Sequence, residues 1–88
     1  MNYKVEYTRK AKRDLKNLSL DVAQNIILSI NSIKSDPYSH VKKIKGTKSH
    51  SLYTHRIGEY RVILSIEDER LLIIVIEAGH RNKIYRKY

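Results

Sequence analysis

The chain has 88 residues, which suits one domain spanning residues 1–88. It holds no cysteine, which excludes disulfides and thiolate zinc sites. Its strongest apolar run, residues 71–76, is far too short to cross a bilayer, so we expect a cytoplasmic protein with no membrane partner. The net charge of +9 at pH 7 is large for this length and predicts an acidic partner, either a nucleic acid or a protein.

The distribution of charge supports that prediction. Residues 42–56 and 79–88 carry several lysines and arginines and no acid, whereas three acids gather at Glu67-Asp68-Glu69. Positive charge can serve solubility alone. Cations that are segregated and interleaved with tyrosines, as in residues 79–88, are typical of surfaces that bind a phosphate backbone and its bases.

The first third of the chain predicts one strand and two helices. Apolar and charged side chains alternate in residues 3–7, which indicates a strand with one buried face. Thr8 can cap the first helix, and Ser19 or Asp21 can cap the second. Asp36-Pro37 ends the second helix, because the residue before a proline is disfavoured in the helical region. The apolar stripes of the two helices are Ala11, Leu15 and Leu18, then Val22, Ile26, Ile30 and Ile33.

The second half predicts a loop at residues 38–50 and then three strands. These strands are expected at residues 52–57, 60–66 and 71–77, joined by turns at Gly58-Glu59 and at 67–70. Strands joined by short turns are antiparallel, and the unbroken apolar run in the last strand indicates a central position with both faces covered. We therefore predict an α+β fold of order β-α-α-β-β-β, in which a mainly antiparallel four-stranded sheet carries a two-helix hairpin on one face.

Three features, taken in order along the chain, resemble a known family. Lys43-Ile44-Lys45-Gly46 precedes a hairpin reading Leu52-Tyr53-Thr54-His55-Arg56-Ile57-Gly58-Glu59-Tyr60-Arg61-Val62-Ile63, and the last strand is followed by Gly79-His80-Arg81 and Tyr85. This set resembles the RelE branch of the RelE/ParE toxin superfamily of prokaryotic toxin–antitoxin systems. The resemblance covers the whole chain, including its length and the order of its elements.

The resemblance implies the toxin of a type II toxin–antitoxin system. Such a toxin is a metal-independent endoribonuclease that needs no cofactor, cuts messenger RNA in the ribosomal A site and so inhibits translation. It also implies an acidic, RelB-like antitoxin that contributes an amphipathic helix, and it allows a heterotetramer of toxin and antitoxin. One departure stands out: the family often carries a lysine or arginine at the positions of Leu52 and Thr54, where it is thought to handle proton transfer.

The family's functional positions fall on four residues whose chemistry suits RNA cleavage, which requires a base, an acid and stabilisation of the phosphorane. The turn at Gly58-Glu59 pairs Arg56 with Arg61, and two like charges side by side are unfavourable without a shared anion. Arg81 can fork onto a phosphate, and Tyr85 can stack on a base or bond the 2′-hydroxyl. We predict Arg61, Arg81 and Tyr85 as catalytic residues.

Further basic residues are predicted to bind the RNA backbone: Lys43, Lys45, Lys48, Arg56, Lys83 and Arg86. His80 and His55 are candidates for supporting roles, with packing against the helices as the favoured alternative for His55. The structural alternative for the cations is a solvated surface, and for Tyr85 it is packing over the sheet edge. The four histidines lack metal-ligand spacing and the acids form no pair suited to Mg²⁺, so no metal site is expected.

Two other functions remain open from the sequence. The first is a non-enzymatic toxin of the ParE branch, which inhibits DNA gyrase by binding. The second is an attenuated homologue that binds RNA without cleaving it. The Gly79-His80-Arg81 triplet with Tyr85 four residues after the arginine favours the nuclease, whereas the missing lysines at Leu52 and Thr54 favour the alternatives.

Overall fold

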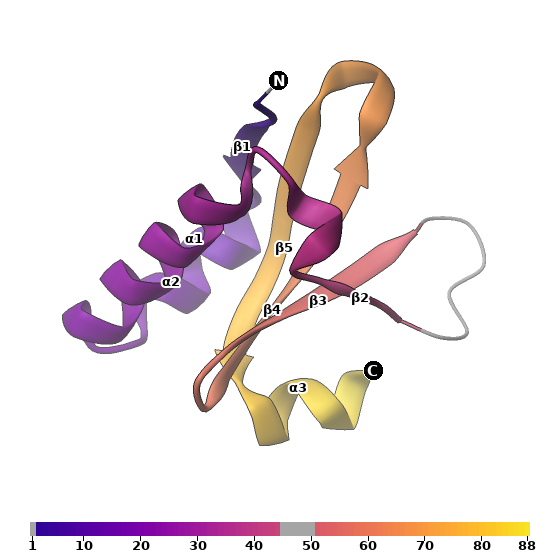
Figure 1. Ribbon diagram of the computed structural model, residues 1–88. Coiled ribbons are helices and arrows are strands. Elements are labelled where there is room, and N and C mark those ends of the chain that lie inside the picture. Colours follow the sequence, from indigo (N-terminus) through magenta and orange to yellow (C-terminus); the bar gives the residue numbers. More distant parts are fainter. Residues whose placement is uncertain (1, 45–50) are drawn as a thin grey trace.

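The computed structural model describes residues 2–44 and 51–88, which form one mixed sheet with helices on both of its faces (Figure 1). The elements are β1 (Lys4–Tyr7), α1 (Arg9–Lys16), α2 (Leu20–Ile33), β2 (Lys42–Lys43), β3 (Leu52–Ile57), β4 (Tyr60–Glu67), β5 (Leu72–His80) and α3 (Arg81–Lys87), with short 3-10 helices at Pro37–Ser39 and Asp68–Arg70. The strand order is β1-β5-β4-β3-β2, and only β1 and β5 run parallel among these neighbours.

The helical hairpin begins where the sequence predicted. The hydroxyl of Thr8 accepts a hydrogen bond from the backbone N–H of Ala11 at 3.1 Å, which caps α1. Ser19, and not Asp21, caps α2 by accepting from the N–H of Val22 at 3.4 Å. A cap of this kind stabilises a helix by about 1 kcal/mol.

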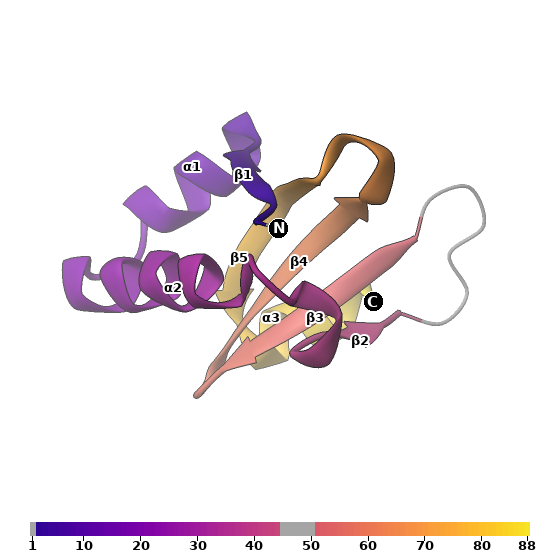
Figure 2. The same cartoon turned by 45° about the horizontal axis from the view of Figure 1, so that its top comes forward.

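Both helices of the hairpin cover the same face of the sheet, as predicted (Figure 2). Their buried side chains pack on the inward residues of the two central strands. This core consists of Ala11, Leu15, Ala23, Ile26 and Ile30 from the helices and Val62, Leu64, Ile66, Ile73, Val75 and Ala78 from β4 and β5. β5 lies between β1 and β4, which confirms the central position predicted from its apolar run.

The prediction of a four-stranded sheet was wrong by one strand. Lys42 and Lys43 form β2, which pairs with β3 and places Lys42 opposite Thr54. Two adjacent lysines carry no apolar alternation, so the pattern that reveals a strand is absent from them. The loop predicted for residues 38–50 also overlaps at its start with the 3-10 helix Pro37–Ser39.

The C-terminal tail also differs from the expectation that the last strand covers residues 71–77. β5 continues through His80, and the chain then forms α3 on the face of the sheet opposite to α1 and α2 (Figure 2). The buried Ile84 anchors this helix, with its side chain in contact range of Gly79. We call the face that carries α3 the open face.

A β-bulge determines which side chains of β5 reach the open face. Between Ile63 and Leu64 of β4, the partners on β5 jump from Glu77 to Val75, so Ile76 is an extra residue. Val75 faces the helical hairpin, and strict alternation of side chains along β5 would turn Glu77 to that same face. The extra residue shifts the phase, so Glu77 lies opposite Ile63 on the open face.

Candidate active site

A cavity of about 280 Å³ lies on the open face where α3 meets β2, β3 and β4. Its lining contains three cations and two phenols, and no carboxylate is among the lining residues of the described chain. The lining residues are Lys42, Lys43, Ile44, Thr54, Arg61, Ile63, Ile84, Tyr85 and Tyr88. An uncompensated group of cations in a cavity favours an anionic ligand.

Arg61 lies at the centre of this cavity. One Nη of its guanidinium donates to the hydroxyl of Tyr85, and the other lies 3.5 Å from the hydroxyl of Thr54. Its Nε is buried and has no hydrogen-bond partner within the part of the chain that the structure describes. A buried donor without a partner costs about 1–3 kcal/mol, so a bound anion that accepts from this nitrogen would remove a penalty that the protein alone carries.

Tyr85 covers the cavity from the second turn of α3. The Cζ of Arg61 lies 4.6 Å from the centroid of the Tyr85 ring, which is a cation–π contact as well as a hydrogen-bond contact. The residue is still 56% exposed, so a stacking base can reach its free surface. The structure therefore brings together two of the three predicted catalytic residues.

The third predicted catalytic residue, Arg81, is not among the residues that line this cavity. It begins α3, and its Nε lies 3.5 Å from a carboxylate oxygen of Glu59 in the β3–β4 turn. His80 is 3.7 Å from the same oxygen and caps α3 by accepting from the N–H of Asn82. These contacts are solvent-exposed, so they hold Arg81 only weakly and leave its guanidinium able to turn toward a ligand.

The β3–β4 hairpin has the predicted register, with Arg56 opposite Arg61. Gly58 makes the tight turn possible because it takes a φ of +57°, which side chains disfavour. Among the described residues the two guanidinium groups bind different partners, since Nε of Arg56 donates to the carbonyl of Gly58 at 3.1 Å. Arg56 is exposed at the tip of the hairpin, where a nucleic-acid backbone can reach it.

His55 lies on the opposite face of β3, against the helical hairpin, in line with the packing that was the favoured alternative for this residue. Its Nε2 is 2.9 Å from the hydroxyl of Ser29 in α2, and its Nδ1 is 3.1 Å from the carbonyl of His40. Burial is the main cause that lowers the pKa of His55 below its ordinary value. These contacts favour a structural role over contact with RNA.

Three of the remaining predicted RNA-binding residues lie in the part of the chain that the structure describes. Lys43 lines the cavity, and Lys83 and Arg86 are exposed on α3. Lys45 and Lys48 lie outside the described residues. Among residues 2–44 and 51–88, no group of three or more histidine, aspartate or glutamate side chains is arranged to hold a metal ion.

Sequence reasoning missed Lys42 as a site residue. Lys42 lies directly opposite Thr54, and a pair in register projects to the same face of a sheet. Thr54 in turn contacts Arg61, so strand pairing brings an ammonium group to the side of the cavity where the family pattern has a basic residue. No periodic signal marks Lys42 in the sequence, because only the pairing of β2 with β3 sets its neighbours.

Sequence reasoning also missed a carboxylate beside the tail. Glu77 is 4% exposed and accepts from the hydroxyl of Tyr88 at 2.5 Å and from Nζ of Lys87 at 3.0 Å. Burial alone would raise the pKa of Glu77, but the hydrogen bonds from Tyr88 and Lys87 outweigh it and hold the pKa below its ordinary value. Burial, followed by the bond to Glu77, raises the pKa of Tyr88 to about 12.

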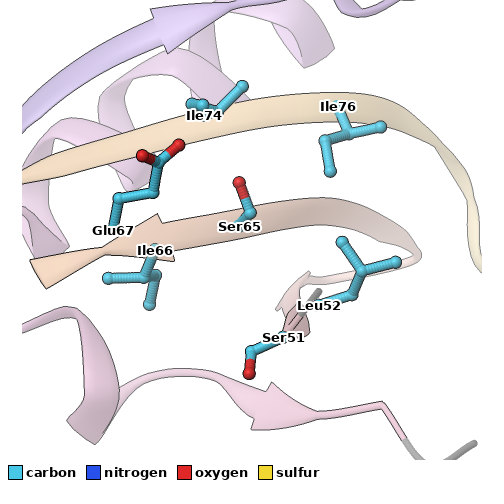
Figure 3. Close-up of a pocket in the computed structure, with 7 residues that line it drawn as sticks. All are labelled: Ser51, Leu52, Ser65, Ile66, Glu67, Ile74 and Ile76. Atoms are coloured by element: carbon cyan, nitrogen blue, oxygen red, sulfur yellow. The ribbon is translucent and has the colours of Figure 1, made fainter. Parts of the chain in front are cut away.

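Larger surface depressions lie elsewhere on the described part of the chain, and two of them bear on the argument. The first, of about 610 Å³, continues the open face beyond α3, where Leu52, Ser65, Ile74 and Ile76 lie over β3, β4 and β5 (Figure 3). The second, of about 700 Å³, runs between α1 and α2 and combines apolar and basic side chains. Its lining residues are Tyr7, Arg9, Lys12, Arg13, Leu15, Lys16, Leu20 and Ile27. None of the helices in the described ranges is both long and apolar enough to span a membrane.

Comparison with known proteins places this architecture in a family. A family model described as "ParE toxin of type II toxin-antitoxin system, parDE" matches residues 5–85. The chain is 26% identical to Toxin RelG of Mycobacterium tuberculosis over 88 residues, which is 99% of this chain and 100% of RelG. It is 23% identical to a putative RelE-like toxin protein of Escherichia coli over 94% of this chain and 87% of that protein.

Solved structures share the fold. A chain in the toxin–antitoxin complex RelBE2 of Mycobacterium tuberculosis superposes with a TM-score of 0.80 at 23% identity, covering 92% of this chain and 93% of that one. The isolated Escherichia coli RelE toxin superposes with a TM-score of 0.72 at 19% identity, covering 97% of this chain and 93% of that one. With the family model matching nearly the whole length, these likenesses show that the chain belongs to the RelE/ParE superfamily of toxins.

Proposed function

We propose that this chain is the toxin of a type II toxin–antitoxin pair and that it cleaves messenger RNA in the ribosomal A site. The observation that carries the proposal is the cavity in which Arg61 donates to the phenol of Tyr85 and keeps a buried Nε that has no partner among the described residues. The cavity presents cations without a carboxylate, which suits a phosphodiester whose negative charge increases in the transition state. The relatives named RelE and RelG support the same assignment.

The residues of the cavity can divide the chemistry among them. The 2′-hydroxyl loses its proton to solvent water as it attacks the adjacent phosphorus, the bond to the 5′-oxygen breaks, and a cyclic 2′,3′-phosphate remains. Arg61 stabilises the phosphorane, and Arg81 adds a second guanidinium when it turns from Glu59 toward the substrate. Tyr85 stacks on a base or bonds the 2′-hydroxyl. Lys42 is the candidate donor of a proton to the departing 5′-oxygen, since an ammonium can give up a proton and a guanidinium does not.

The direct test uses purified protein and ribosomes programmed with a defined messenger RNA. We expect cuts within the A-site codon that appear without added divalent metal beyond what the ribosome requires. Arg61→Ala serves as the matched inactive protein, because it removes the central cation without touching the helical hairpin. Intact messenger RNA in the presence of wild-type protein would refute the nuclease proposal.

An antitoxin partner is part of the same proposal, and the groove between α1 and α2 is suited to receive it. The groove exposes Leu20, which is 71% accessible, beside four cations: Arg9, Lys12, Arg13 and Lys16. A partner that fits is an acidic amphipathic segment, whose apolar side covers the leucine while its carboxylates meet the cations. Solved relatives that carry the same fold include toxin–antitoxin complexes, which supports this assignment.

The match to the ParE model supports a second candidate function, inhibition of DNA gyrase by binding. In that case the basic cavity would contact gyrase or its DNA and no RNA would be cut. A supercoiling assay with purified gyrase separates the two functions, since a ribosome-dependent nuclease leaves supercoiling unchanged. Inhibition of supercoiling together with intact messenger RNA would favour the ParE-like function.

A further inference from the structure

Glu77 is a buried carboxylate to which the proposed reaction assigns no step. The bulge in β5 turns it to the open face, beneath the end of α3. There it accepts from Tyr88 at 2.5 Å and from Lys87 at 3.0 Å, and Nζ of Lys10 in α1 lies 3.6 Å away. Because Glu77 is only 4% exposed, these partners interact with it more strongly than surface ions do.

The helix that Glu77 holds is too short to be stable alone. α3 has seven residues, and isolated helices shorter than about 12 residues are marginal in water. Its first turn is attached to the β3–β4 turn by the N–H of Arg81, which donates to the carbonyl of Glu59 at 2.8 Å. Ile84 anchors its middle, and the two bonds to Glu77 anchor its last residues.

Tyr85 lies between those anchors and depends on them for its place. Tyr85 is 56% exposed, and its side chain contacts Arg61 across the cavity. A helix that frays at Lys87 and Tyr88 would let Tyr85 move away from Arg61. We propose that Glu77 is a positioning residue, which anchors the end of α3 and thereby holds the Tyr85 phenol against Arg61. The predicted effect of Glu77 on the cleavage rate rests on the proposed nuclease function, whereas its effect on the position of Tyr85 does not.

The position of Tyr85 can be measured without any activity. Protein labelled with 3-fluorotyrosine gives a ¹⁹F spectrum in which Tyr85 is identified by the loss of a peak in Tyr85→Phe. We expect Glu77→Gln to shift and broaden that peak, because the charge that holds Lys87 is gone. Tyr88→Phe removes the other bond and serves as a second variant if Glu77→Gln is poorly folded. Glu69→Gln, the same change in an exposed turn, is the matched control and should leave the peak in place.

Kinetics test whether Glu77 acts through Tyr85. We expect Glu77→Gln to lower the single-turnover cleavage rate by about tenfold to a hundredfold with little change in KM, because small misplacements of a reacting group have effects of that size. In a Tyr85→Phe background the same substitution should lower the rate by less than about twofold, since residues acting as one unit are not additive. An unchanged Tyr85 peak, or effects that multiply fully in the double variant, would overturn the inference.

The cleavage assay and the ¹⁹F spectra test the nuclease proposal and the role of Glu77 separately. If wild-type protein cuts no messenger RNA, the nuclease proposal fails while the ¹⁹F spectra still decide whether Glu77 places Tyr85. If wild-type protein cuts RNA and Glu77→Gln leaves both peak and rate unchanged, only the role of Glu77 is refuted. If Glu77→Gln does not fold, the same two measurements on Tyr88→Phe decide the role of Glu77. Tyr88 is exposed at the end of the described chain, so this substitution should leave the fold intact.

Discussion

Arg61 combines three interactions that a strand arginine on an ordinary surface does not make together. Its guanidinium donates to a phenol, lies against the ring of the same tyrosine and approaches the hydroxyl of Thr54. These contacts fix the planar group, and the buried Nε is left without a partner in the described chain. A guanidinium held in one orientation stabilises a developing negative charge without reorganising during the reaction.

The first prediction concerns the two arginines. Arg61→Ala and Arg81→Ala should each lower the cleavage rate about 10²–10³-fold, the usual loss for one preorganised contact to a transition state, and each should abolish growth arrest. Arg81→Lys should lose most of the activity too, because an ammonium cannot span two phosphate oxygens. Cleavage assays and growth after induction measure this, and circular dichroism checks the fold. Full toxicity in both alanine variants would place the active site elsewhere.

The second prediction concerns Lys42. Lys42→Ala should slow cleavage by about a hundredfold, within the range of general acid catalysis. A substrate with sulfur in place of the departing 5′-oxygen should recover most of that loss, because a thiolate leaves without a proton. Lys4→Ala, an exposed lysine on β1 at the far edge of the sheet, is the charge-matched control. Equal loss on both substrates would limit Lys42 to binding the RNA.

The helical hairpin and the sheet are joined by hydrogen bonds of His55 as well as by the apolar core. His55 links β3 to Ser29 of α2 on one side and to the carbonyl of His40 on the other. With Nδ1 donating to the carbonyl, the neutral ring accepts from Ser29 at Nε2. His55 lies between Thr54 and Arg56 in β3, and its side chain is on the opposite face of the strand. Its hydrogen bonds therefore support the strand that carries part of the site.

The third prediction is a pH dependence of the folding stability, which comes from the buried His55. The pKa of His55 is lowered in the folded protein, so the unfolded chain binds the proton more readily. The stability that the neutral ring contributes is present above about pH 6.5, the ordinary value for histidine. This stability is lost as the pH falls below that value toward the lower pKa that His55 has in the folded protein. The midpoint of thermal unfolding should therefore fall between pH 7.5 and 5.5 more steeply in the wild type than in His55→Gln. Parallel curves would contradict it.

At the scale of the molecule, the described residues present positive charge on two separate concave surfaces. One is the cavity on the open face, and the other is the groove between α1 and α2. A substrate and an inhibitor can use different surfaces, but a single antitoxin chain that spans both would neutralise much of the charge of +9. Association driven by such charge should be fast and should slow as salt is added.

The fourth prediction tests the groove. Leu20→Ser should weaken antitoxin binding by about tenfold or more, because burying a leucine contributes roughly 1.5–3 kcal/mol. Leu28→Ser is the matched control, since Leu28 is also on α2 and 65% exposed but does not line the groove. Calorimetry with the antitoxin that we propose as the partner measures both. Equal effects of the two substitutions would show that the partner does not dock between the helices.

The pattern of the sequence alone determined much of the fold. Alternation in residues 3–7, the caps at Thr8 and Ser19 and the two apolar stripes are local signals, and each is confirmed. The turn at Gly58-Glu59 also fixed the pairing of Arg56 with Arg61, because a two-residue loop leaves one register. The ordered motifs were sufficient to indicate the family that the comparisons show.

Only the tertiary structure decided which side chains meet. Lys42 reaches the cavity through the pairing of β2 with β3, and two lysines give no local sign of that pairing. The bulge at Ile76 turns Glu77 away from the helical hairpin, and a bulge depends on how two strands fit together. The tail forms a helix because its Ile84 packs near Gly79 of β5 and because Glu77 of β5 binds Lys87 and Tyr88. Local patterns fix elements, whereas contacts between residues far apart in sequence exist only once the elements have packed.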